Sequence, residues 1–192
     1  MLFLNSFMLL AQETKSETSK EFQDNLNKEY ADKEESPLTE EDFKDFKGLD
    51  FYPISAKFIV EATFTRSENE QSFKMKTTGT RTPEYIKYGE LHFKLENKEF
   101  KLNVYQGLDL MKKPGFENYL FLPFFDLTCG KESYMGGRYM DLHLPMGKTV
   151  IIDFNKAYNP YCAYNHRYSC PIVPLENDLE VEILAGVKKF HD

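Results

Sequence analysis

The feature that most constrains the fold of this chain is a series of short segments with a residue period of two. Every second residue from Phe58 to Phe64 is apolar, as expected of a strand that buries one face. Residues 91–95 and 100–104 alternate in the same way around a turn at 96–98, which predicts a hairpin. Because no helical pattern separates the segments, we predict an all-β fold, a single antiparallel sandwich or barrel of about eight strands. Further strands are expected at residues 85–88, 119–125, 138–143, 149–154 and 179–184.

The net charge of −7 is unevenly distributed along the chain. Residues 12–47 carry 12 acidic and 6 basic side chains, whereas residues 48–192 carry 19 and 18. The larger part is nearly neutral and lacks the excess of basic side chains that is typical of proteins that bind nucleic acids. We therefore expect no nucleic acid among its partners. A chain of 192 residues is long enough for one domain with a sizeable core, but its oligomeric state is not indicated.

Two parts of different character are predicted after residue 11. Few apolar residues occur at 12–35, which predicts an acidic flexible tail or a marginal helix. A β-rich domain is expected over 36–192, and it begins with a short helix for which Thr39 suits the N-cap position. Phe43 and Phe46 would form the buried side of this helix.

Residues 1–11 form a short apolar run that ends in Ala11. The run resembles the hydrophobic region and cleavage end of a secretory signal peptide, although the basic residues that normally precede it are missing, as in a truncated signal. It is too short to span a bilayer, so no transmembrane segment is expected. The pattern predicts a periplasmic or secreted protein. If the run is instead a buried strand or helix turn, the protein would be cytoplasmic.

The segment 153–171 has neither a helical nor a strand period. It contains four Tyr, three Asn, one His, one Arg and two Cys. Irregular segments of this length are usually functional loops or loops held by crosslinks. We expect the loop to fold back and border a pocket for a small polar or anionic ligand, or for a component of the cell envelope. The residues predicted to bind this ligand are Arg138, Tyr139, Asn155, Lys156, Tyr158, Asn159 and His166.

An alternative interpretation is a hydrolase-type enzyme. Asp141 and His143 share one face of the predicted strand 138–143, where the carboxylate could orient and charge the imidazole. If a hairpin follows this strand in the simplest register, Asp153 lies across from Tyr139 on the same polar face. His143, Asp141 and Asp153 would then be catalytic candidates, with Arg138 as the charge-stabilising group. In a third interpretation these side chains form an ordinary solvent-exposed face, and the domain is purely structural.

Cys162 and Cys170 permit several interpretations. A disulfide would close a nine-residue loop and suits an exported protein, whereas unpaired thiols would be structural. A metal site with His166 lacks a fourth ligand, and a Cys162 nucleophile with His166 as its base lacks an orienting group. The disulfide is favoured, and neither a metal nor another cofactor is expected. Cys129 is interpreted as a buried or turn cysteine.

Several longer motifs resemble an uncharacterised bacterial family that carries the domain of unknown function 1684. The resemblance is dense from about residue 121 to 186 and thinner back to about residue 57. It implies a mostly β domain, often in exported proteins, whose signature is the Gly-Gly-Arg and Asn-x-Ala-Tyr-Asn-Pro segments. It implies no particular reaction. The motifs are Phe121-Leu-Pro-Phe-Phe-Asp, Gly130-Lys-Glu-Ser-Tyr-Met-Gly-Gly-Arg-Tyr-Met-Asp-Leu, Asp153-Phe-Asn-Lys-Ala-Tyr-Asn-Pro-Tyr-Cys-Ala-Tyr, Cys170-Pro and Glu176-Asn.

Overall fold

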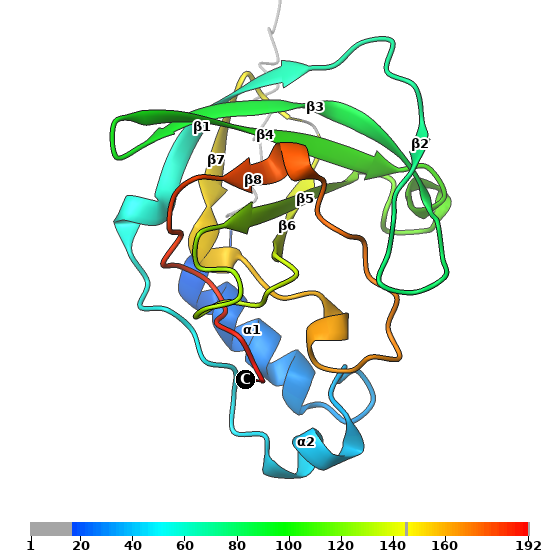
Figure 1. Ribbon diagram of the computed structural model, residues 1–192, viewed down its shortest axis with the longest axis vertical. Coiled ribbons are helices and arrows are strands. Elements are labelled where there is room, and N and C mark those ends of the chain that lie inside the picture. The colour runs from blue at the N-terminus through cyan, green and yellow to red at the C-terminus, as the bar shows by residue number, and fades with distance from the viewer. Residues whose placement is uncertain (1–16, 145, 192) are drawn as a thin grey trace, which may run out of the picture.

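The computed structural model describes residues 17–144 and 146–191 (Figure 1). The helices are α1 (Ser19–Ala31) and α2 (Glu40–Asp45). The strands are β1 (Ile59–Arg66), β2 (Phe73–Lys74), β3 (Glu84–Leu95), β4 (Lys98–Gly107), β5 (Tyr119–Asp126), β6 (Arg138–His143), β7 (Thr149–Asp153) and β8 (Asp178–Leu179). Short 3-10 helices are η1 (Ala56–Phe58), η2 (Leu110–Lys112), η3 (Phe154–Lys156), η4 (Tyr161–Ala163) and η5 (Leu175–Asn177).

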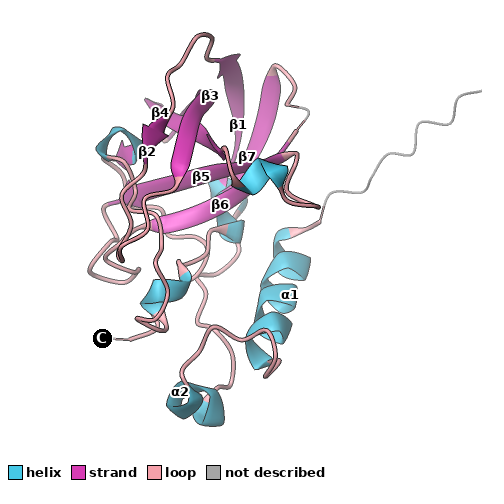
Figure 2. Cartoon of the chain, turned by 90° about the vertical axis from the view of Figure 1, so that its right-hand side faces the viewer, coloured by secondary structure: helices cyan, strands magenta, loops and turns pink. Residues whose placement is uncertain are grey.

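All eight strands belong to one sheet. Its order is β6–β5–β4–β3–β1–β7, with β2 beside β3 and β8 beside β5. Paired strands are antiparallel except β8, which runs parallel to β5. The sheet curls into a half-barrel, and α1 and α2 lie together beyond one end of it (Figures 1 and 2). The prediction of a mainly β, antiparallel fold of about eight strands is confirmed.

The hairpin of β3 and β4 forms where the local sequence signal is strongest. Leu95 pairs with Lys98, and the two residues between them, Glu96 and Asn97, have φ angles of 51° and 66°. Positive φ at both central positions matches the twist of a two-stranded ribbon, and Asn tolerates this conformation well. The predicted hairpin is confirmed.

The main core lies on the inner face of the sheet, where the chain after β8 covers it. Each large apolar side chain that is fully buried contributes about 1.5–3 kcal/mol. The alternating strand residues therefore account for much of the stability of the half-barrel. Fully buried members of this core include Leu91, Leu102, Leu120, Leu122, Phe124, Ile152, Phe154 and Ile183.

Of the two interpretations of the N-terminal segment, the structure shows the helix, because residues 19–31 form the packed helix α1 instead of a flexible tail. A capping box of Thr18 and Glu21 begins the helix. Leu26 and Tyr30 are buried in a second apolar cluster. The physical reason is the spacing of Phe22, Leu26 and Tyr30, which places three apolar residues on one helical face even though the average composition is polar. Helix α2 follows as predicted, with the Thr39 side chain accepting a hydrogen bond from the Asp42 backbone.

The predicted hairpin between the strands at 138–143 and 149–154 is wrong. Strand β6 pairs with β5, and β7 pairs with β1, so the two strands are the opposite ends of the strand order. Asp153 lies across from Ile59 rather than Tyr139. Tyr139 instead exchanges two backbone hydrogen bonds with Tyr158, at 2.8 and 3.0 Å. Strand pairing over long sequence separations is not determined by local turn signals.

The described residues carry no helix that is long and apolar enough to cross a membrane. The apolar run 1–11, predicted to be a signal peptide, lies outside the residues that the structure describes.

Candidate functional site

Arg138, which was predicted to bind the ligand, is a core residue in the structure. Its guanidinium is fully buried, with Nη2 2.7 Å from Asp126 Oδ2. It also donates hydrogen bonds to the backbone carbonyls of Ile183 and Ala185. The preceding Gly137 has a φ of 83°, and a Cβ there would lie 2.7 Å from a backbone oxygen. The Gly-Gly-Arg motif therefore allows a close backbone approach that directs the arginine into the core.

Asn155 and Asn159, also predicted to bind the ligand, form hydrogen bonds that hold the fold together. Both are fully buried. The Asn155 amide donates a hydrogen bond to the Ser55 carbonyl and accepts one from the Ser55 backbone N–H, each at 3.0 Å. The Asn159 amide donates to the carbonyl of Lys188 at 2.8 Å. Through these side chains, the loop supplies hydrogen-bond partners for backbone N–H and C=O groups of neighbouring segments, which is a structural role.

The loop 153–171 packs against the sheet and α1, and three of the cavities that it borders include residues predicted for the site. The aromatic cavity, of about 350 Å³, includes Tyr139, Asp141 and Tyr158. The seam cavity, of about 290 Å³, lies between the ends of the strand order and includes Asp141, His143, Asp153 and Lys156. The thiol cavity, of about 490 Å³, includes Cys162 and His166. The predicted site residues that border a cavity are thus divided among three places, and Asp141 is the one that borders two of them.

The aromatic cavity is lined by residues from helix α1, the β4–β5 connection, strands β5 and β6, and the loop 153–171. Its two acidic residues are Glu29 and Asp141. Asp141 keeps exposed surface at the cavity, although the surrounding protein desolvates its carboxyl group. Helix α1 forms one wall, so the cavity exists only because the N-terminal segment is folded. The aromatic residues are Phe22, Phe116, Tyr119, Tyr139, Tyr158 and Tyr161.

Two phenols hold the Asp141 carboxylate in position. Tyr119 and Tyr158 both donate to Oδ1, at 2.9 and 2.5 Å. Among the described residues, none forms a hydrogen bond with the other oxygen, Oδ2. Burial raises the pKa of Asp141 above its usual value, and the two phenol hydrogen bonds oppose that shift. Burial, followed by the nearby Asp141 charge, raises the pKa of both tyrosines, which therefore remain proton donors.

The seam cavity brings together the three catalytic candidates, of which Asp153 is already engaged by hydrogen bonds through both oxygens. Asp153 accepts from Ser19 Oγ at 2.6 Å and from the Asn155 side chain at 2.8 Å. Lys156 donates to the backbone carbonyl of Glu17. His143 is exposed, with its ring edge-on to Tyr119 at 6.0 Å between centroids. Asp153 and Lys156 therefore attach the loop to the start of α1.

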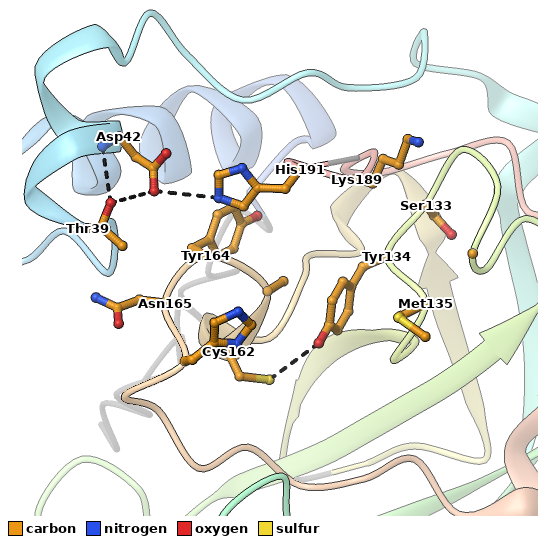
Figure 3. Close-up of a pocket in the computed structure, with 13 residues that line it drawn as sticks. Thr39, Asp42, Ser133, Tyr134, Met135, Cys162, Tyr164, Asn165, Lys189 and His191 are labelled. Atoms are coloured by element: carbon orange, nitrogen blue, oxygen red, sulfur yellow. Dashed lines mark hydrogen bonds and ion pairs between the residues drawn. The ribbon is translucent and has the colours of Figure 1, made fainter.

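Cys162 borders the thiol cavity and interacts with Cys170, which borders the aromatic cavity instead. Both are free, and Cys170 Sγ accepts a hydrogen bond from the Cys162 backbone at 3.2 Å. Figure 3 shows the Tyr134 hydroxyl directed at Cys162 Sγ, 3.9 Å away. The hydrogen bond from Cys170 is the main reason that the pKa of Cys162 falls to about 6, and it raises the pKa of Cys170. The predicted disulfide between them stays a prediction.

Elsewhere in the thiol cavity, Asp42 Oδ2 lies 3.5 Å from His191 Nε2 (Figure 3). His166 is exposed at its edge. The part of the chain that the structure describes contains no cluster of three or more His, Cys, Asp or Glu side chains able to hold a metal. Cys129 lies half-buried in the turn after β5 and contacts the Asp126 backbone.

Sequence reasoning missed several residues of the aromatic cavity. Phe22 and Glu29 belong to the segment predicted to be a flexible tail or marginal helix, and Tyr119 lies on the predicted strand 119–125, for which no site residue was proposed. The stripe of Phe22, Leu26 and Tyr30 was the available signal for α1. Recognising this stripe as a helix would have placed Glu29, the residue before Tyr30, on the same helix.

Comparisons with known proteins agree with the fold. Residues 44–188 match the model of a family described as "Protein of unknown function (DUF1684)". The solution NMR structure of an uncharacterised protein from Haloarcula marismortui is similar, with a TM-score of 0.68 and 34% sequence identity. The likeness covers 86% of this chain and 89% of that one. No curated protein matches the chain.

Proposed function

The chain belongs to the DUF1684 family, and from this premise we propose that its β-domain is a binding module that holds a small ligand in the aromatic cavity. The observation that carries the proposal is the Asp141 carboxylate, fixed by Tyr119 and Tyr158 beside a cavity of about 350 Å³. Ligand sites are typically concave and mostly apolar, with a few polar groups that fix orientation. The aromatic cavity has this composition.

A polar ligand is better supported than an anionic one. The anionic interpretation depended on Arg138 and Lys156, but Arg138 is paired with Asp126 in the core. Lys156 borders the seam cavity instead of the aromatic cavity. Tyr139, Tyr158 and Asp141 remain as the predicted residues that contribute to the proposed site.

Thermal shift measurements with a panel of small polar compounds test this function. We expect at least one compound to raise the melting temperature of the natural protein and of a Tyr88→Phe control. Tyr88 stacks on Phe64 and lies outside the aromatic cavity, so its substitution matches the chemical change without touching the site. Tyr158→Phe should weaken the response, because it removes one of the two phenols that orient Asp141. Absence of a response to every compound would contradict a binding function.

A hydrolase is the second candidate, supported by the shared position of Asp141, His143 and Asp153 around the seam cavity. It predicts turnover of an ester or glycan that is lost in His143→Ala. Arg138 cannot serve as its charge-stabilising group because it is buried. Turnover that is undetectable, or that is unchanged by His143→Ala, would exclude this candidate and leave the binding module or a purely structural domain.

We further propose that the protein is exported to the periplasm or the medium, from the signal-like residues 1–11. A cell-envelope component would then be accessible as ligand. Fractionation of cells that express the full chain with a C-terminal tag tests this proposal, with a chain lacking residues 1–11 as the control. Export predicts that only the full chain leaves the cytoplasm. Retention of both chains would contradict it.

A further inference from the structure

The charges of the aromatic cavity have one sign. Glu29 and Asp141 contribute carboxylates, and none of the described residues that line it is Lys, Arg or His. A negatively charged ligand would therefore meet repulsion, whereas a cation would be attracted to both carboxylates. The open Oδ2 of Asp141 leaves one oxygen free to face such a ligand.

The aromatic rings of the cavity are arranged at steep angles to one another. Tyr139 and Tyr158 lie 6.0 Å apart at 87°, and Phe116 and Tyr119 lie 5.9 Å apart at 76°. In such pairs the edge of one ring meets the face of the other, so rings of different orientation surround the same space. The negative face of an aromatic ring attracts a cation, and sites for quaternary ammonium groups are commonly built from several such rings.

The phenols also support a positive ligand through their hydrogen bonds. Tyr119 and Tyr158 donate to Asp141, and Tyr161 donates to Glu29 Oε1 at 2.7 Å. A hydroxyl that donates to a carboxylate becomes polarised, which makes its ring richer in electrons. Each carboxylate is thus coupled to a ring that lines the cavity. Burial makes the ionised form of Asp141 costly, as its raised pKa indicates, and a bound cation would offset that cost.

From this geometry we propose that the aromatic cavity binds a small organic cation, a quaternary ammonium or alkylated amine group, with the charge near Asp141 and Glu29. The proposal rests on the binding function proposed above and specifies its ligand class. The rings would surround the alkyl groups, and the carboxylates would balance the charge. Binding is non-covalent and requires no other reactant.

Isothermal titration of the full chain with choline tests the ligand class. The matched neutral ligand is 3,3-dimethylbutan-1-ol, which has a carbon atom in place of the charged nitrogen and nearly the same shape. We expect choline to bind at least about tenfold more tightly than the neutral analogue. Asp141→Asn should remove this preference while keeping an oxygen that can accept from both tyrosines. Asp178→Asn, at an exposed position outside the cavity, is the matched control and should preserve it.

The outcomes separate this inference from the function on which it rests. If both ligands bind equally, the cavity binds a small molecule but does not select for charge, and the inference is overturned while the binding function stands. If a compound of the polar panel binds but choline does not, the inference is again overturned. If nothing binds, including the whole panel, the binding function fails as well. An unchanged preference in Asp141→Asn would place the cation elsewhere and would also overturn the inference.

Discussion

The two faces of strand β6 contain polar residues in opposite situations. Arg138 points into the core, where Asp126 and two backbone carbonyls satisfy most of its donors. Asp141, on the other face, has one oxygen held by two tyrosines and one oxygen open toward a cavity. Arg138 is needed by the fold because its loss would leave the Asp126 charge uncompensated in the core. A carboxylate that is oriented but only half satisfied is prepared to meet a further group. This contrast distinguishes the structural arginine from the candidate ligand site.

The largest effect is expected from breaking the buried ion pair. Arg138→Ala leaves the Asp126 carboxylate without its charge partner inside the core, which costs about 3–5 kcal/mol. Chemical denaturation would measure the lost free energy of unfolding, with the exposed Lys148→Ala as a control. A loss below about 1 kcal/mol would mean that Arg138 is not the structural residue described here.

A smaller loss is expected when the wall of the aromatic cavity is weakened. Leu26→Ala removes a buried side chain from the contact of α1 with the loop, at a cost of about 2–3 kcal/mol. It should also weaken ligand binding, because α1 forms one wall of the cavity. Lys28→Ala, on the exposed side of the same helix, controls for changes in helix propensity. Equal stability of the two variants would indicate that residues 19–31 behave as the flexible tail first predicted.

Oxidation of the neighbouring thiols tests the predicted disulfide. A mild two-electron oxidant should convert Cys162 and Cys170 into a disulfide. The reaction is favoured because the thiolate of Cys162 lies beside the Cys170 sulfur. The mass should fall by about 2 Da, and the closed loop should stabilise the fold by about 2–3 kcal/mol. Cys129→Ser should leave both changes intact, whereas Cys170→Ser should abolish them. An unchanged mass after oxidation would refute the pairing.

The smallest effect on stability is expected at Asp141. Its pKa is raised in the folded protein, so the folded state holds the proton more tightly than the unfolded chain. The contribution of Asp141 to the free energy of unfolding is therefore most favourable at low pH. It decreases as the pH rises above 3.8, the pKa of this group in the unfolded chain. At pH 7, Asp141→Asn should keep or slightly raise the melting temperature, by at most about 4 °C, while it removes the preference for choline over its neutral analogue. A marked fall in the melting temperature would indicate a structural carboxylate like that of Asp126.

Local signals account for the parts of the fold that the sequence predicted. The β3–β4 hairpin follows from alternation on both sides of Glu96 and Asn97, and α2 follows from its Thr39 cap. The partner of β6 could not be read from the residues after it, because its pairing with β5 is non-local. Helix α1 was predicted only as a marginal alternative to a flexible tail, because its few apolar residues are diluted by charged ones.

The candidate site was predictable only in part, for a similar reason. Tyr139, Asp141 and Tyr158 were singled out, and they do border one cavity. Arg138 lies on β6 next to Tyr139, but neighbouring residues of a strand point to opposite faces, so the Arg138 side chain is directed away from the cavity. Tyr119 and Glu29 reach the cavity from elements far away in the sequence, and no local pattern connects them to Asp141.

NMR spectra of the tyrosine rings, recorded during a titration with choline, test the central claim most directly. Tyr119 and Tyr158 border the aromatic cavity, whereas Tyr52 lies beside Arg138 on the core side. We predict that the ring signals of Tyr119 and Tyr158 shift in proportion to bound ligand while those of Tyr52 stay in place. Signals of Tyr119 and Tyr158 that remain unchanged at saturating choline would contradict a ligand site on the outer face of β6.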